Sequence, residues 1–154
     1  MDWPTYTAAL AARLGTVTAG SASIATATDV LPDAPFSFPF LLVRDPVLDY
    51  VQSWGGWVRG TATFEVICLL DGRGDVPGRQ AAVRAWSNVL PYGVLVHARL
   101  GASFPTRGEA RVTRCEPEIA LDGGSGIEFA GEVYDGVRLT VECDFEEAHP
   151  EMAV

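Results

Sequence analysis

One stretch organises this sequence: RGTATFEVICLL (59–70), followed directly by DGRGDVPGRQAAVRAWSNVLP (71–91). Successive side chains of a strand point to opposite faces of a sheet. The alternation of apolar and polar residues in 59–70 therefore predicts a strand with one face on the core. That face carries Ala62, Phe64, Val66, Cys68 and Leu70. On the other face, Ile67 and Leu69 are also apolar. The end of the strand is therefore expected to be covered on both faces, as in a central strand.

The second half of the stretch predicts a helix. Residues 71–74 are turn formers, Asp75 is a candidate N-cap, and Pro77 suits a first helical turn. Apolar residues then recur at helical spacing, namely Ala82, Trp86, Val89 and Leu90. Pro91 is expected to end the helix. The stretch as a whole predicts a helix lying on a sheet.

Length and composition indicate a single domain, residues 1–154. The 48% apolar and 20% charged content is typical of a globular protein with a real core. The longest apolar run is far shorter than the roughly 20 residues of a membrane helix, and no signal peptide is visible at the N-terminus. Cys68, Cys115 and Cys143 are widely spaced, which favours free thiols over a metal site or a disulfide.

The charge balance bears on partners. The formal net charge is −9, and every one of the 11 basic residues is Arg. This balance argues against a surface that grips phosphates, and we expect no specific nucleic-acid binding. It still permits a surface that DNA passes without adhering.

The remaining segments predict a second helix and further strands. The N-terminal helix begins at Asp2 as its cap and ends near Gly15; residues 16–28 are either a weak strand or a flexible connector. Strands are expected at 40–43, 109–116, 127–133 and 137–145, with a bend at Tyr134-Asp135-Gly136 and a frayed tail at 146–154. The fold class expected is α+β: a mostly antiparallel sheet of about four strands, with two main helices on one side.

Residues 44–58 look like a long loop without regular pattern, and such loops are often functional. This loop holds Tyr50, Trp54 and Trp57. One interpretation is that these aromatic side chains fold back onto their own domain. The other is that they pack on a neighbouring subunit, because aromatic residues are enriched at interfaces.

No pattern for catalysis, cofactor binding or metal binding is found. His97 has no Gly-x-Ser-x-Gly elbow to support a triad, and zinc ligands are not clustered. The glycines at 72, 74 and 78 fit neither phosphate-binding fingerprint. Arg73-Gly74-Asp75 matches a receptor-binding tripeptide, but a helix cap is the simpler interpretation. We therefore expect a protein that is not an enzyme and has no cofactor.

Acidic residues line the outward face of the last predicted strand. Glu142 and Asp144 lie two residues apart, and Glu146 extends the row. Carboxylates paired in a cleft can carry out acid–base chemistry, but on the outside of a strand they more often form a solvated face.

Taken together, the chain resembles the tail terminator (tail completion) proteins of long-tailed bacteriophages and prophage elements. The resemblance rests on the short N-terminal helix, the lead Leu31-Pro32-Asp33-Ala34-Pro35 into strand 40–43, and Asp45-Pro46 with the long loop after it. It continues with the strand 63–70 feeding the helix 78–90, and with Tyr134-Asp135-Gly136-Val137 before the last strand. The absence of Lys fits a phage of a GC-rich host.

The resemblance implies a non-enzymatic structural protein whose copies form a ring, usually a hexamer. Such a ring ends the tail tube and provides the head-attachment surface. Its partners would be itself, the tail tube protein and the head–tail connector protein, with no membrane. It would be located in the virion tail at the head-proximal end, after assembly in the bacterial cytoplasm.

Two sets of residues are candidates for roles in such a ring. Tyr50, Trp54 and Trp57 are candidates for the subunit interface. Glu142, Asp144 and Glu146 are candidates for the ring lumen, where acidic residues would leave passing DNA mobile.

Two alternatives remain. A head–tail connector or neck protein would also form rings. A small ligand-binding or hydrolase domain would use the Trp54–Trp57 loop as a lid over a pocket.

Overall fold

The computed structural model describes residues 3–33, 37–99, 110–121 and 125–148. The helices in this part of the chain are α1 (Trp3–Leu14) and α2 (Val76–Arg99). The strands are β1 (Thr18–Ala19), β2 (Ala22–Ser23), β3 (Thr26–Thr28), β4 (Phe40–Val43), β5 (Val47–Trp54), β6 (Trp57–Leu70), β7 (Arg111–Glu118), β8 (Ile127–Phe129) and β9 (Glu132–Ala148).

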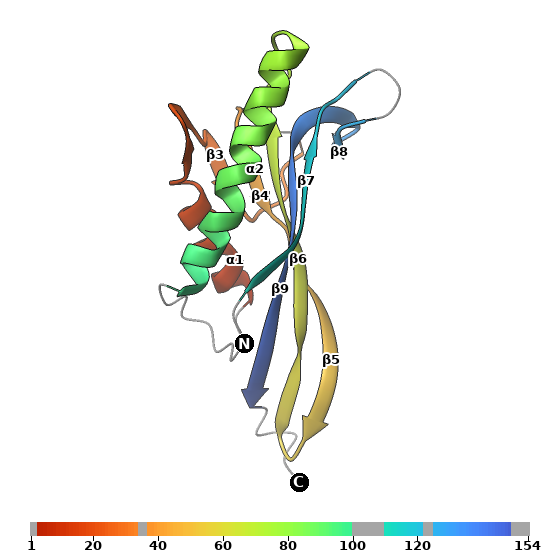
Figure 1. Cartoon of the computed structure of the whole chain (residues 1–154). Coiled ribbons are helices and arrows are strands. Elements are labelled where there is room, and N and C mark those ends of the chain that lie inside the picture. Colours follow the sequence, from red (N-terminus) through yellow and green to blue (C-terminus); the bar gives the residue numbers. More distant parts are fainter. Residues whose placement is uncertain (1–2, 34–36, 100–109, 122–124, 149–154) are drawn as a thin grey trace.

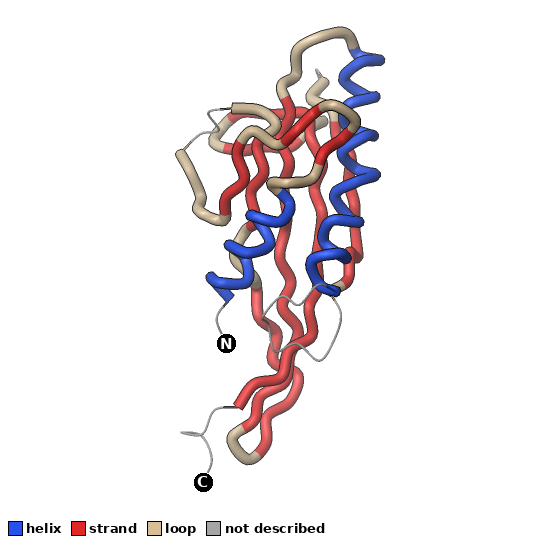
Figure 2. The backbone as a smooth tube through the Cα atoms, turned by 90° about the vertical axis from the view of Figure 1, so that its left-hand side faces the viewer, coloured by secondary structure: helices blue, strands red, loops and turns tan. Residues whose placement is uncertain are grey.

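The described strands form a seven-stranded mixed sheet and a separate two-stranded sheet of β1 and β2. The main sheet has the order β3-β4-β6-β9-β7, with β5 also paired to β6 and β8 also paired to β9. Only the β3–β4 pair among these is parallel. The long strands β6 and β9 run through the whole molecule, and both helices lie on one face of the sheet (Figures 1 and 2).

The predicted fold class is wrong. Strands make up 47% of the structure and helices 27%, so the protein is mostly β rather than α+β with about four strands. Its two helices do lie on one side of the sheet (Figure 2). Two segments account for most of the additional strands. Residues 16–28, where the sequence left a strand or a connector open, hold β1, β2 and β3 of two or three residues each, and β5, expected as part of a loop, lacks a buried face. Residues 127–133, expected as one strand, form β8 and the start of β9.

The predicted core faces of the two long strands are confirmed. The even-numbered residues 62–70 of β6 and the odd-numbered residues 137–145 of β9 are buried against the helices. The antiparallel register places Phe64 opposite Val141 and Ala62 opposite Cys143. Ile67 and Leu69, on the other face of β6, are buried in a second cluster with Phe40, Leu42 and Ile127. The end of β6 is therefore covered on both faces, as predicted.

Helix α1 ends where predicted, with Leu14 buried and Gly15 directly after it. Its proposed cap, Asp2, lies outside the described residues. Residues 16–28, for which the sequence left two interpretations, form the short strands β1, β2 and β3.

Helix α2 begins as predicted but is longer than predicted. The Asp75 carboxylate accepts a hydrogen bond from the Gly78 backbone N–H at 3.0 Å, which confirms Asp75 as the N-cap. The helix continues through Pro91 to Arg99, so the prediction that Pro91 ends it is wrong. Beyond the proline, Val94 and His97 are buried on the same side as Leu90, and this tertiary packing holds the last turns in place.

The predicted bend at Tyr134-Asp135-Gly136 is also wrong, because all three residues lie inside β9. The turn falls earlier, at Ala130 and Gly131, which both have positive φ and join β8 to β9. Asp135 is instead a buried partner of Arg79, at 2.7 Å between Arg79 Nη2 and Asp135 Oδ1. It also accepts a hydrogen bond from the Ala120 backbone N–H. A short polar side chain that favours turns is thus fixed in a strand by a long-range ion pair.

Residues 44–58 are not an irregular loop. Val47–Trp54 is the strand β5, which pairs with β6 through a hairpin turn at Gly55 and Gly56. Both glycines have positive φ, +44° and +86°, as a two-residue hairpin turn requires. The predicted frayed tail begins too early as well, because residues 146–148 belong to β9 and pair with Trp57–Arg59. Residues 149–154 lie outside the described part of the chain.

Candidate functional site: the arm, the acidic row and the helix groove

The molecule has a body and a projecting arm. The arm consists of residues 49–60, from β5 and β6, and residues 145–148, from β9. It extends beyond the two helices, which cover only the body (Figures 1 and 2). Backbone pairing on both sides of β6 holds it together, so the arm is a sheet ribbon and not a mobile lid loop.

The root of the arm is anchored by aromatic rings. Phe145 is buried, and its ring meets the rings of Trp3 and Tyr50 edge-on, with centroid distances of 5.8 Å in both cases. Gly60 lies between Tyr50 and Phe145 in the strand register. A Cβ atom at Gly60 would lie 2.8 Å from Phe145 Cζ, so the glycine makes room for the Phe145 ring. The arm is thereby joined to the core through α1.

Beyond this root, the arm exposes large apolar side chains. Tyr50 is 62% exposed, Val51 72%, Trp54 43% and Trp57 44%. Val47, just before the arm, is exposed as well. Large apolar side chains exposed close together on a protein surface indicate a candidate interaction site.

The structure brings two of the three predicted interface residues together. Trp54 and Trp57 are directly opposite each other across the hairpin turn, on the face of the sheet away from the helices. Tyr50 pairs with Gly60 and lies on the helix side, where it meets Phe145. The three aromatic residues therefore belong to one arm but do not form one patch.

Sequence reasoning missed Val51. A β-bulge between Tyr50 and Gln52 leaves Val51 without a register partner on β6. The bulge shifts the alternation of side chains, so the period-two pattern of β5 is broken in the sequence. The Gly55-Gly56 pair between two aromatic residues was the available signal for a hairpin.

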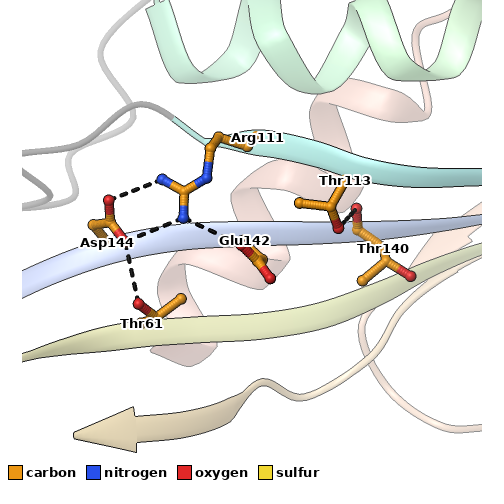
Figure 3. A network of polar contacts seen from close by, with 6 residues as sticks. All are labelled: Thr61, Arg111, Thr113, Thr140, Glu142 and Asp144. Carbon is orange, nitrogen blue, oxygen red and sulfur yellow. Dashed lines mark hydrogen bonds and ion pairs between the residues drawn. The ribbon is translucent and has the colours of Figure 1, made fainter. Parts of the chain in front are cut away.

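The acidic row lies on the open face of the sheet and is neutralised in part. Arg111 of β7 donates hydrogen bonds to Asp144 at 2.8 Å and to Glu142 at 3.2 Å, and Thr61 donates to Asp144 at 3.2 Å (Figure 3). Glu146 continues the row and is opposite Arg59 in the strand register. The guanidinium of Arg111 lowers the pKa of Asp144. The row is therefore part of a charge-paired surface, and it is not purely negative.

The rest of the open face follows the same pattern. Arg138 lies 3.7 Å from Glu65 and 3.9 Å from Glu118, and Arg114 lies 3.1 Å from Glu116. These arginines are thus paired with carboxylates, Arg138 with residues of the neighbouring strands and Arg114 with a residue of its own strand. Such pairs at a surface add little stability individually, and they set the electrostatic character of the face.

A groove on the opposite side of the molecule, between α1 and α2, was not predicted. This helix groove has a volume of about 390 Å³ and is lined by three valines and a tyrosine, Val17, Val89, Val96 and Tyr92, together with the polar residues Arg13, Thr16, Thr18 and Asn88. Its floor is close-packed, because Gly93 lets Leu14 and Val17 approach α2. Tyr92 is 68% exposed. The groove joins residues far apart in sequence, so no local pattern reveals it.

His97 is a buried residue under α1. It is 5% exposed, its ring meets Tyr6 at a centroid distance of 5.5 Å, and its Nε2 atom has no hydrogen-bond partner. Burial lowers the pKa of His97, and Arg13 lowers it further. The described residues contain no group of three or more His, Cys, Asp or Glu side chains arranged to hold a metal ion. Neither described helix is long and apolar enough to cross a membrane.

Sequence comparisons with known proteins assign no family to this chain. No protein-family model matches the chain, and no curated protein is significantly similar to it in sequence. Function therefore has to be inferred from the arm, the acidic row and the groove.

Proposed function

We propose that this protein is a non-enzymatic structural subunit that assembles into a ring, terminates a phage tail tube and presents the surface to which the head attaches. The observation that supports the proposal most is the arm, which projects from the body and exposes Tyr50, Val51, Trp54 and Trp57. A monomer gains nothing by exposing these side chains to water, because burial of apolar area is the main favourable term in association.

The position of the arm favours a ring over a symmetric dimer. The exposed aromatic pair lies at one end of the molecule, and the helix groove lies on the body. Contacts between two different patches are heterologous, and repeated heterologous contacts close into rings when the rotation permits. The open face of the sheet, with Glu142, Asp144 and Glu146, remains the candidate lining of the ring.

The experiment that tests the proposal uses tail tubes and heads prepared separately. Purified protein is mixed with tail tubes that carry no head, and with heads that carry no tail, and both mixtures are imaged by electron microscopy. A terminator adds a ring to one end of the headless tubes. Binding to tailless heads alone would identify a neck protein, and binding to neither would contradict the proposal.

A further inference from the structure

We propose that the Trp54–Trp57 end of the arm of one copy inserts into the helix groove of the next copy. This inference rests on the proposed ring, and it names the two surfaces that meet in it. It makes the contact head-to-tail: each subunit contributes an arm to one neighbour and a groove to the other.

The two surfaces match in chemistry and size. The arm ends in two tryptophans on one face of a hairpin, each more than two-fifths exposed. The groove offers three valines and Tyr92 around a hollow of about 390 Å³. This volume falls within the range of about 300–1,000 Å³ found for pockets that enclose small ligands. Indole rings filling a valine-lined hollow would bury apolar surface on both partners.

The charges of the two surfaces are also complementary. Among the described residues that line the groove, Arg13 is the one charged residue. The arm sequence, residues 49–60 and 145–148, holds three acidic residues and one arginine. An acidic arm is attracted to a groove whose described lining carries Arg13, and this favours the arm as occupant over another basic surface.

The arm cannot fill the groove of its own chain. It is a hydrogen-bonded ribbon that points away from the helices, and its tight turn at Gly55 and Gly56 leaves no slack for folding back (Figures 1 and 2). The occupant is therefore a second copy. The competing arrangement is an arm-to-arm contact, which is isologous and stops at a dimer.

The test uses two full-length variants that each lose one half of the contact. Trp54→Ala with Trp57→Ala removes the arm end and leaves the groove intact. Tyr92→Asp places a negative charge in the groove and leaves the arm intact, and Tyr92 is exposed enough for the fold to tolerate the change. Gln80→Asp is the matched control, because it puts the same charge on α2 about three turns away. Masses are measured by sedimentation over a concentration series.

The expected result is complementation. Each variant alone associates at least about tenfold more weakly than the wild type, as for loss of a central interface residue. The equimolar mixture forms a heterodimer of twice the 16.5 kDa subunit mass and grows no further, since only one arm and one groove remain intact. Gln80→Asp assembles like the wild type.

Other outcomes overturn the inference in distinguishable ways. If Tyr92→Asp alone assembles normally, the groove is not the receiving site, while the proposed ring stands. If Tyr92→Asp stops at a homodimer and the mixture forms no heterodimer, the arms meet each other. If the wild type stays at 16.5 kDa at every concentration, with and without tail tubes, the proposed function fails as well.

Discussion

The ring of Tyr50 meets the ring of Phe145 edge-on, with the centroids 5.8 Å apart and the planes at 86°. Phe145 meets Trp3 of α1 in the same way on its other side. A line of three aromatic residues thus joins the exposed arm to the core. These ring contacts tie the root of the arm to the core, although Tyr50 at its outer end stays 62% exposed.

Gly60 is the position at which this root can be tested. Gly60→Ala would place a Cβ atom against Phe145 and against the backbone carbonyl of Asp49, so the ring and β5 would have to move. We expect a loss of about 1–3 kcal/mol in the free energy of unfolding, measured in urea. Gly72→Ala is the control, since its Cβ atom would make only ordinary contacts. Equal midpoints of urea unfolding for Gly60→Ala and the wild type would show that the root of the arm is loosely packed.

The Arg79–Asp135 pair is expected to matter for stability. Asp135→Ala leaves the Ala120 N–H without its acceptor and Arg79 without its carboxylate. The expected destabilisation is about 1–3 kcal/mol. Asp71→Ala, which breaks an exposed ion pair with Arg73, should change stability far less. Thermal and urea unfolding of both variants would decide this, and a similar loss for each would count against a special role for Asp135.

The same pair predicts acid sensitivity. Arg79 lowers the pKa of Asp135 in the folded protein, so the native state binds fewer protons than the unfolded state at low pH. The stabilisation is complete above the unfolded pKa of about 3.9 and is lost as the pH falls from there through the folded pKa. In Asp135→Ala, the free energy of unfolding should depend less steeply on pH below about pH 4. An unchanged slope there would show that other carboxylates dominate.

His97 predicts a second window of pH dependence. Burial and Arg13 lower its pKa, so the folded protein resists the proton that the unfolded chain accepts. Stability should therefore decline as the pH falls below the ordinary histidine value of about 6.5. His97→Leu removes this decline and also the unpaired Nε2 atom, and the variant should be at least as stable at acidic pH. A decline that persists in His97→Leu would contradict this assignment.

The three cysteines, all within the described residues, should differ in reactivity. Cys68 and Cys143 are buried, and burial raises the pKa of Cys68 to about 12, whereas Cys115 is exposed. A thiol reagent should modify one equivalent quickly in the native protein and the other two only on unfolding. Cys115→Ser should abolish the fast phase. Fast modification of two or more thiols would mean that the core opens readily.

The long core strands were predictable because their pattern is local. β6 and β9 alternate cleanly, and Asp75 is followed by a helix with a regular apolar face. Two local signals led to wrong predictions. Asp135-Gly136 is a turn signal and Pro91 is a helix breaker, but long-range packing overrides both. Strand β5 was missed because the bulge at Val51 breaks its alternation and water reaches both of its faces.

The candidate site was predictable only in part. The aromatic residues 50, 54 and 57 stood out by type, but their distribution over two faces depends on the hairpin register. The acidic row was visible as a strand face, while its pairing with Arg111 depends on β7 lying beside β9. The helix groove depends on how α1 crosses α2, which single-sequence patterns do not reveal.

That the arm joins one copy to the next is tested most directly by the mass of the particles in solution. Light scattering is measured for the wild type and for Trp54→Ala with Trp57→Ala, alone and with tail tubes. Leu121→Ala with Val133→Ala is the control, because it removes apolar side chains of similar exposure from outside the arm. We predict a ring-sized multiple of 16.5 kDa for the wild type and the control, and a folded 16.5 kDa monomer for the arm variant. An arm variant that assembles as the wild type does, with only its melting temperature lowered, would contradict the claim.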